Sequence, residues 1–460
     1  MAQAHHETGH LALAERFGPA YSTAQAVRDQ HCRGEAHVSA MPPDAVVFAV
    51  STEDVVTAVT ICAEHRIPVI AHGTGTSLEG HINAVQGGVC IDLTGMNRIL
   101  EVRSEDMDVR VQAGVTRKQL NTHLRDQGLF FPIDPGADAS LGGMCATRAS
   151  GTNAVRYGTM RDNVLNLTAV MADGTVVTTG RRARKSAAGY DLTRLLVGSE
   201  GTLGIITEVT LRLHGIPESI ASAVCAFDTL EGAVQTTMET IQSGIPIARM
   251  ELLDPLTIKA VNSYSKLTLL EAPHLFMEFH GSPASVEEQS AAVAELAAAN
   301  GGSGFDWATL EEERNRLWQA RHDTYYATRG LAPEKVSFST DICVPISRLA
   351  ACIAETHADI EELDLLAPIV GHVGDGNFHV IVLMDEADAD EVERARIFKE
   401  RLVSRALAHD GTCTGEHGVG MGKMAHLEQE LGAGVALMRS IKKALDPDNI
   451  LNPGKIFEPD

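Results

Sequence analysis

The stretch VIAHGTGTS, residues 69–77, leads from a short apolar run directly into a loop of glycines and hydroxyl-bearing residues. The apolar run predicts a buried strand, and the backbone N–H groups of the loop could bind phosphate oxygens. The spacing of Gly73, Gly75 and Gly80 does not fit G-x-G-x-x-G, and no G-x-x-x-x-G-K-[ST] motif occurs. Neither a Rossmann site nor a P-loop is therefore expected, and such a loop taken alone is more often an ordinary turn.

Two further segments have the same small-residue character. DPGADASLGGM at 134–144 is followed by SGTNAVRYG at 150–158, and LVGSEGTLGII covers 196–206. Small residues let the backbone approach a flat ligand closely. Three well-separated loops of this kind are difficult to explain as turns only, and they favour a large flat cofactor.

These three segments resemble, in order and approximate spacing, the flavin-contacting segments of FAD proteins of the vanillyl-alcohol oxidase type. The resemblance covers residues 40–458 and implies FAD bound in an extended form. Covalent members have a histidine where Thr76 stands, so the resemblance implies non-covalent FAD, although His72 lies close by. The cofactor-binding residues that it implies are His72, Gly73, Thr74, Gly75, Thr76, Ser77, Pro135, Gly136, Ser140, Gly143, Gly151, Asn153, Gly158, Glu200, Gly204, Ile206 and Asn452.

A second group of motifs combines histidines with a carboxylate. GHVGDGNFH places His372 and His379 on either side of a Gly-Asp-Gly turn, and GTCTGEHGVGMGK contains Glu416 and His417. Two histidines and one glutamate are the ligand count of an open divalent-metal site, and an adjacent histidine is a natural general base. Because the chain has 19 histidines, the pair alone would more often be structural. The flavin-type loops and the adjacent pair Glu416–His417 favour a functional role of the two histidines over a structural one.

The same two motifs resemble the signature segments of the FAD-linked 2-hydroxy-acid dehydrogenases. Carried over residue by residue, the resemblance implies His372, His379 and Glu416 as ligands of a divalent metal, zinc or manganese, and His417 as the base. Arg321 lies where such enzymes keep an arginine for the substrate carboxylate, which suits its bidentate geometry. The alternative for Arg321 is a helix-surface arginine, because three other arginines lie nearby in the sequence.

The expected substrate is a short or apolar D-2-hydroxy acid, with D-lactate preferred. Relatives that act on 2-hydroxyglutarate tend to have a lysine in YKYDL and an asparagine two residues after the second histidine. This chain has STD at 339–341 and Ile381 at those places, so it lacks a partner for a distal carboxylate. The resemblance is closest to the cytochrome-linked D-lactate dehydrogenases and implies cytochrome c or a quinone as electron acceptor.

Three alternatives stay open. A glycolate or D-2-hydroxyglutarate dehydrogenase on the same scaffold would be separated by a substrate panel. A non-catalytic flavin subunit would be expected to lack the histidine and glutamate motifs. A hydrolase that uses the metal without a flavin would be colourless after purification.

The composition is that of an ordinary globular protein with two or three domains, since 44% of its 460 residues are hydrophobic. The formal net charge of −23 disfavours nucleic acids and anionic membranes as partners. No apolar stretch reaches the roughly 20 residues that cross a bilayer, and no signal peptide is apparent. The eight scattered cysteines suit a reducing compartment. A cytoplasmic enzyme is expected, peripheral at a membrane only through its electron acceptor, and a homodimer is left open.

The alternation of strand and helix patterns, with the resemblance, predicts an α+β fold. The expected parts are an N-terminal helical segment (1–38), a two-part FAD-binding domain of the vanillyl-alcohol oxidase type (39–217), an α/β cap domain with an antiparallel sheet for substrate and metal (218–420), and a C-terminal segment (421–460). The C-terminal segment is expected to return to the FAD-binding domain.

Overall fold

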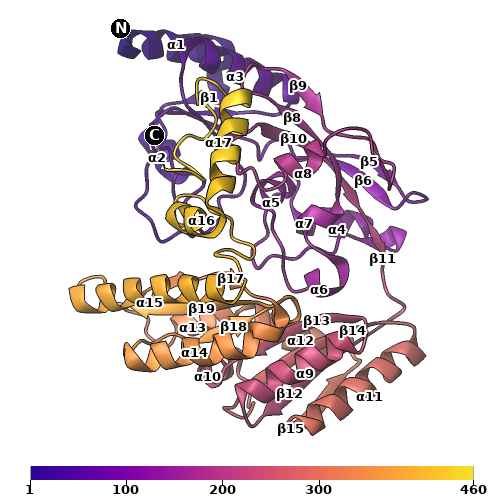
Figure 1. Ribbon diagram of the computed structural model, residues 1–460. Coiled ribbons are helices and arrows are strands. Elements are labelled where there is room, and N and C mark those ends of the chain that lie inside the picture. The colour runs from indigo at the N-terminus through magenta and orange to yellow at the C-terminus, as the bar shows by residue number, and fades with distance from the viewer. Residues whose placement is uncertain (1, 459–460) are drawn as a thin grey trace. The chain divides into compact units, whose positions relative to one another are not determined.

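A computed structural model of the protein describes residues 2–458, with side chains from residue 5 onward. The chain divides into two units, which are described in turn (Figure 1). The first unit contains Met1–Ser150, Gly158–Ile216 and Glu416–Asp460, and the second contains Gly151–Tyr157 and Pro217–Gly415. The chain therefore leaves the first unit and returns to it, which confirms the predicted α+β class with a returning C-terminal segment.

A four-stranded sheet carries the first glycine-rich loop. Its order is β1-β2-β4-β3, with the bounds Tyr21–Ser22 (β1), Ala45–Phe48 (β2), Val69–His72 (β3) and Val89–Asp92 (β4). β2, β4 and β3 are parallel, and their residues are mostly buried, as expected for short apolar runs in a parallel sheet. The loop begins where β3 ends, at the carboxyl edge of the parallel strands, which is where such sheets bind ligands.

A five-stranded antiparallel sheet forms the rest of this unit's framework. Its order is β5-β6-β10-β8-β9, with the bounds Ile99–Arg103 (β5), Asp108–Gln112 (β6), Ile205–Arg212 (β10), Val164–Val170 (β8) and Val176–Thr178 (β9). A small separate pair consists of β7 (Leu129–Phe130) and β11 (His214–Gly215). A turn at Asp173 and Gly174 joins β8 to β9 as a hairpin.

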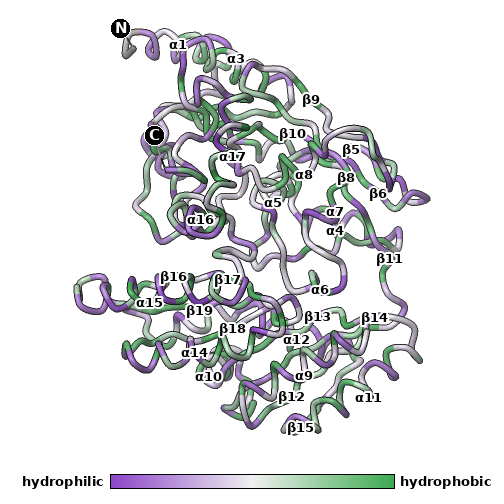
Figure 2. The backbone as a smooth tube through the Cα atoms, in the orientation of Figure 1, coloured by the Kyte–Doolittle hydropathy of each residue, from purple (hydrophilic) through white to green (hydrophobic). Residues whose placement is uncertain are grey.

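Helices pack on both sheets of the first unit. They are α1 (Ala2–Phe17), α2 (Gln25–Gln30), α3 (Thr52–His65), α4 (Arg117–Leu124), α5 (Leu141–Thr147), α7 (Met160–Asn163), α8 (Leu192–Leu196), α16 (Met424–Leu431) and α17 (Ala433–Leu445). α3 shows why these segments are helical: Ser51 and Asp54 form a capping box, and its buried residues recur every three to four positions. Figure 2 shows the hydrophobic residues of α5 and β10, which belong to one core of this unit.

An antiparallel sheet is the framework of the second unit. Its order is β15-β12-β14-β13-β18-β19-β16, and β17 also pairs with β19. The bounds are Ser219–Phe227 (β12), Ile247–Leu253 (β13), His274–Gly281 (β14), Gly302–Ala308 (β15), Val336–Ser339 (β16), Ile342–Cys343 (β17), Ile369–Gly371 (β18) and Asn377–Met384 (β19). Every residue of β19 is buried, so this strand lies in the interior of the unit.

The helices of the second unit cover this sheet and enclose its main hydrophobic core. They are α6 (Ala154–Tyr157), α9 (Leu230–Gln242), α10 (Pro255–Ser265), α11 (Pro283–Ala299), α12 (Glu311–His322), α13 (Thr324–Arg329), α14 (Leu349–Glu362) and α15 (Ala389–Ala408). Across residues 2–458, no helix combines the length and the apolar character needed to cross a membrane. All eight cysteines are free thiols, as expected.

Candidate active site

The first two flavin-type loops lie against each other in the first unit. The backbone N–H of Ser140 donates to Thr74 Oγ1 at 3.4 Å. A Cβ atom on Gly73 would lie 2.3 Å from Ser140 Oγ, and one on Gly143 would lie 3.0 Å from it. Only glycine fits at residue 73 without moving the serine. The structure thus brings together the two loops that the sequence assigns to the cofactor.

The third flavin-type loop is attached to the C-terminal segment through Glu200. Its buried carboxylate accepts hydrogen bonds from the N–H groups of Val419 at 2.7 Å and Gly420 at 2.8 Å. Burial would raise the pKa of Glu200, but His81 and these N–H groups lower it more, so the carboxylate is ionised. Asn452 Nδ2 donates to the backbone oxygen of Glu200 at 2.7 Å. Glu200 and Asn452 therefore hold the segments of the first unit together.

The other predicted cofactor residues are divided between the units. The first unit also contains Pro135, Gly136, Gly158, Gly204 and Ile206. The second unit contains Gly151 and Asn153, and there Asn153 Oδ1 accepts a hydrogen bond from Arg249 Nε at 3.0 Å. The role of these two residues at the cofactor stays a prediction.

Strands β18 and β19 position the two motif histidines in the second unit. His372 directly follows β18, and His379 lies within β19 opposite Val370. The turn between them has Gly376 in the left-handed region at φ +79°, and a Cβ there would lie 2.1 Å from a backbone oxygen. The turn reverses the chain so that the centroids of the two imidazole rings are 5.3 Å apart.

A buried carboxylate, Glu251, lies beside His372. β13 pairs with β18 so that Leu252 faces Gly371, and this register brings Glu251 close to His372. His372 Nδ1 lies 2.8 and 2.9 Å from the two oxygens of Glu251 and donates to this carboxylate. Arg321 donates to the same carboxylate through Nε at 2.9 Å and through Nη2.

This arrangement keeps Glu251 charged inside the protein. Burial would raise its pKa, but His372 and Arg321 lower it more. Arg321 is itself buried, on α12, and is not the surface arginine of the alternative reading. Its Nη1 makes no hydrogen bond with the residues that the structure describes, so this nitrogen can donate to another partner.

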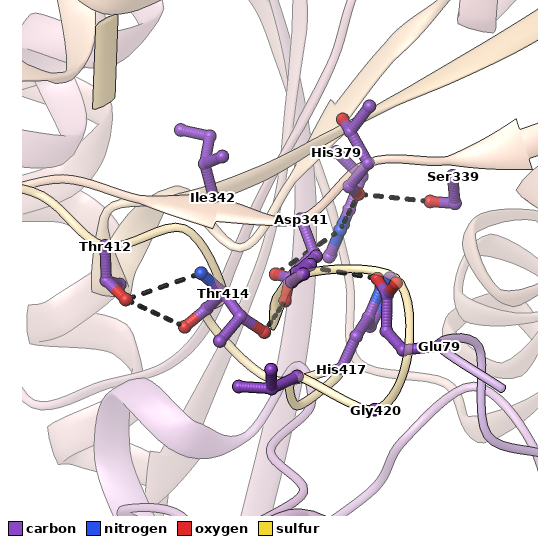
Figure 3. A network of polar contacts seen from close by, with 12 residues as sticks. Glu79, Ser339, Asp341, Ile342, His379, Thr412, Thr414, His417 and Gly420 are labelled. Atoms are coloured by element: carbon purple, nitrogen blue, oxygen red, sulfur yellow. Dashed lines mark hydrogen bonds and ion pairs between the residues drawn. The ribbon is translucent and has the colours of Figure 1, made fainter. Parts of the chain in front are cut away.

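Asp341 anchors the loop that precedes Glu416. Its Oδ2 accepts a hydrogen bond from Thr414 Oγ1 at 2.8 Å (Figure 3), and its Oδ1 accepts one from Asn377 Nδ2 at 2.8 Å. Oδ1 also lies 3.8 Å from His379 Nδ1. Asp341 therefore connects the strand of His379 to the loop that continues into Glu416.

Glu416 and His417 begin the last segment of the first unit, which wraps around Glu79. His417 Nδ1 lies 4.0 Å and Lys423 Nζ 3.2 Å from Glu79 Oε1, and Figure 3 shows Glu79 beside His417. A Cβ on Gly420 would lie 2.2 Å from the backbone oxygen of Glu79. Gly420 is thus required by the close approach of two backbone segments.

Comparisons with known proteins agree with this geometry. Residues 216–456 match the family described as FAD linked oxidases, C-terminal domain, and residues 43–180 match the FAD binding domain family. The chain belongs to the FAD-linked oxidases. A Danio rerio protein named probable D-lactate dehydrogenase, mitochondrial, is 56% identical to this FAD-linked oxidase over 441 residues, which cover 95% of this chain and 89% of that protein.

A second relative and a solved structure extend the comparison. The mitochondrial D-lactate dehydrogenase [cytochrome] of Arabidopsis thaliana is 47% identical over 424 residues, which cover 92% of this FAD-linked oxidase and 75% of that protein. The structure of p-cresol methylhydroxylase with substrate bound has a TM-score of 0.83 at 18% identity, and the match covers 99% of this chain and 98% of that one. This likeness concerns the fold, and it confirms the vanillyl-alcohol oxidase type.

The first unit of this FAD-linked oxidase suits the cofactor of its family. Ser77 Oγ and Ser199 Oγ, in the first and third loops, are buried and have no hydrogen-bond partner among residues 5–458. Buried hydroxyl groups are normally paired, so two unpaired ones in cofactor loops indicate places for ligand atoms. Gly73 packs so closely on Ser140 that a side chain at residue 73 would collide with the serine hydroxyl.

The motif histidines suit a divalent metal. His372 Nδ1 donates to Glu251, and His379 Nδ1 donates to the backbone oxygen of Thr340 at 3.0 Å. Such bonds select the tautomer whose Nε2 lone pair is available for a metal, as in most protein metal sites. Glu416 follows Gly415 directly in the chain, one residue beyond the second unit.

Three residues of this site were not assigned roles from the sequence: Glu79, Glu251 and Asp341. Glu251 offered one signal, because a lone carboxylate inside the apolar strand segment MELL is unusual and requires a partner. Glu79 directly precedes Gly80 in the sequence and resembles an ordinary loop residue. Asp341 is notable in the sequence only as part of STD at 339–341, where relatives that act on 2-hydroxyglutarate tend to have a lysine.

Proposed function

We propose that the protein oxidises D-lactate, or a similar short D-2-hydroxy acid, to the 2-oxo acid, with non-covalent FAD and a divalent metal. The observation that carries this proposal is the 56% identity, over 95% of the chain, to a protein named probable D-lactate dehydrogenase. Electrons would leave the reduced flavin for a cytochrome or a quinone. The orientation of His372 and His379 by Glu251 and Thr340 supports the metal-binding part.

Each residue of the site has a defined task in this proposal. His372, His379 and Glu416 hold the divalent ion, zinc or manganese, and Arg321 pairs with the substrate carboxylate through its remaining Nη1. When bound, the ion would supply a Lewis acid that lowers the pKa of the 2-hydroxyl, and FAD would supply the acceptor for the hydride from the substrate carbon. His417 takes the hydroxyl proton, so that loss of one proton and one hydride turns the alcohol into the ketone.

The surroundings of His379 support a short substrate. Ile381 is buried and pairs with Ser339 across the sheet, two residues along β19 from His379. Neither side chain carries a positive charge that could pair with a second carboxylate. A dicarboxylic 2-hydroxy acid would therefore lack a charged partner at this place.

Stereochemistry tests the reaction most directly. The purified yellow protein is mixed anaerobically with D-lactate or L-lactate while the flavin absorbance is followed. Bleaching by the D form only is expected. Bleaching by glycolate or D-2-hydroxyglutarate but not by D-lactate would transfer the proposal to those substrates, and no bleaching by any of them would contradict it.

The role of His417 gives the first mutational prediction. His417→Ala should keep FAD but lose bleaching by D-lactate, by at least about 100-fold in rate, because the hydroxyl proton has no acceptor. His123→Ala, which changes an exposed histidine of the same unit, is the matched control and should behave like the wild type. Flavin reduction at the wild-type rate in His417→Ala would remove the base assignment.

We also retain the electron acceptor, the cytoplasmic location, the homodimer and the domain roles as predictions. Residues 39–217 would bind FAD, and residues 218–420 would supply the substrate and metal groups. The names of both relatives place those proteins in mitochondria, so cell fractionation is the test of location for this chain.

A further inference from the structure

A second cluster of possible metal ligands lies entirely within the first unit, at the carboxyl edge of its parallel strands. β3 and β4 pair in parallel with His72 opposite Asp92, so the two side chains lie on the same face at neighbouring strand ends. His31 follows the end of α2 and completes the cluster. The relative exposures of His31, His72 and Asp92 are 4%, 9% and 6%.

The three side chains converge. His31 Nε2 lies 2.9 Å from Asp92 Oδ2, and the rings of His31 and His72 have centroids 4.7 Å apart. One ring nitrogen of each histidine and one oxygen of Asp92 all lie within 4.8 Å of one another. These separations require only small side-chain movements to place an ion about 2.0–2.2 Å from each ligand atom.

The surrounding bonds orient two of the ligands as an outer shell does in known metal sites. His31 Nδ1 donates to the backbone oxygen of Val27 at 2.7 Å, which directs Nε2 at the cluster. Asp92 Oδ1 accepts hydrogen bonds from the N–H and the hydroxyl of Thr94 at 2.7 and 2.6 Å. Oδ2 is thereby left facing His31.

An ion pair between His31 and Asp92 would explain only part of this cluster. That ion pair does not include His72. The Nδ1 atom of His72 is buried and has no hydrogen-bond partner among the described residues. An imidazole with an unused nitrogen, beside a carboxylate and a second imidazole, is a ligand set for a divalent ion of the zinc type.

We propose that His31, His72 and Asp92 bind a zinc-type divalent ion that ties the segment after α2 to the end of β3. Three protein ligands leave one position for a water molecule. A hollow of about 510 Å³, lined by Ala26, Asp29, Gln30, Arg33, His72 and Thr74, gives an ion access to the site. Because His72 directly precedes the first flavin-type loop, the ion would stiffen the start of that loop.

Zinc content tests the proposal without reference to activity. The FAD-loaded protein is stripped with a chelator, incubated with Zn²⁺, desalted and analysed for zinc per chain. The wild type should hold two ions, and Asp92→Asn and His31→Gln should each hold one. Asp29→Asn, which changes a carboxylate at the rim of the same hollow, should still hold two. An Asp92→Asn protein with as much zinc as the wild type would overturn the proposal.

Two further measurements keep this site separate from the proposed active-site metal. His379→Ala should also hold one ion, and the double variant with Asp92→Asn should hold none. If His379→Ala keeps both ions, the active-site metal fails while this site stands. Should the variants misfold, anomalous diffraction at the zinc edge from wild-type crystals decides: a peak between His31, His72 and Asp92 is expected, and none would refute the site.

Discussion

At the scale of single residues, buried carboxylates hold the side chains on which the proposed chemistry depends. A buried charge is tolerated only when it is paired, and each of these carboxylates has its partners. Glu251 accepts hydrogen bonds from His372 and Arg321. Asp341 accepts hydrogen bonds from Thr414 and Asn377. These residues touch the proposed ligands and fix their orientation without being ligands themselves.

Glu251 gives a prediction about metal affinity. In Glu251→Gln, the His372 ring loses its charged acceptor and Arg321 loses its counterion, so zinc binding at the proposed active site should weaken by about 10–100-fold. The measurement is competition with a chromophoric chelator in the Asp92→Asn background, where only this site should bind zinc.

Glu278→Gln is the matched control for that experiment. Glu278 is also a buried glutamate of the same sheet, on the neighbouring strand β14, but its bonds go to His280 and Ser222 rather than to His372. Zinc affinity should be unchanged in Glu278→Gln. Equal affinities of the two variants would mean that Glu251 does not position His372.

At the scale of elements, close backbone contacts decide where glycine is required. The loop after His417 passes so close to Glu79 that a side chain on Gly420 would collide with backbone, and Gly420 also has φ +49°. A Cβ atom added to Gly434, near the start of α17, would lie 3.5 Å from the Cβ of Leu431, which is ordinary van der Waals contact. The same substitution should therefore have opposite effects at the two places.

Gly420→Ala should destabilise the first unit by about 2 kcal/mol or more, since both the contact and the φ angle are unfavourable for alanine. Gly434→Ala should be neutral or stabilising by up to about 1 kcal/mol, because alanine favours the helix. The increase in flavin fluorescence on heating reports release of FAD from the unfolding protein. Equal midpoints for the two variants would contradict the packing described around Glu79.

The pair of strands β13 and β14 gives a prediction about acid stability. Burial would raise the pKa of Glu278, but Arg249 and His280 lower it to about 2. A carboxyl group with a depressed folded pKa stabilises the protein above its unfolded value of 4.5 and loses that contribution as the pH falls toward 2. Glu278→Gln removes this pH-dependent contribution.

The stability difference between wild type and Glu278→Gln should accordingly shrink by about 2 kcal/mol between pH 6 and pH 3. Urea unfolding followed by tryptophan fluorescence measures this stability difference. Both tryptophans, Trp307 and Trp318, belong to the second unit, which also contains Glu278. A difference that stays constant over this range would show that Glu278 is not ionised at low pH in the folded protein.

At the scale of the whole molecule, the formal net charge of −23 bears on the electron acceptor. A basic cytochrome would be attracted by this charge, and salt would screen the attraction. The rate with cytochrome c should therefore fall by about tenfold between low and physiological ionic strength, while the rate with a neutral quinone should change little. Identical salt dependence for the two acceptors would exclude electrostatic docking.

Features that depend on neighbours in the chain can be predicted from local sequence patterns. The apolar run of β3 is local, and its sequence pattern predicted it. The capping box of α3 and the turn at Asp173 and Gly174 are local features as well. The glycine-rich loops were recognisable for the same reason, because small residues are needed wherever the backbone approaches another group closely.

Contacts that depend on strand register, in contrast, form only when the strands pair in the folded protein. Glu251 is 121 residues from His372 and 70 from Arg321, and they meet because β13 pairs with β18 at Leu252 and Gly371. His72 and Asp92 likewise become neighbours through the register of β3 and β4. A shift of one residue in either pairing would turn these side chains to the opposite face, and no local pattern specifies that choice.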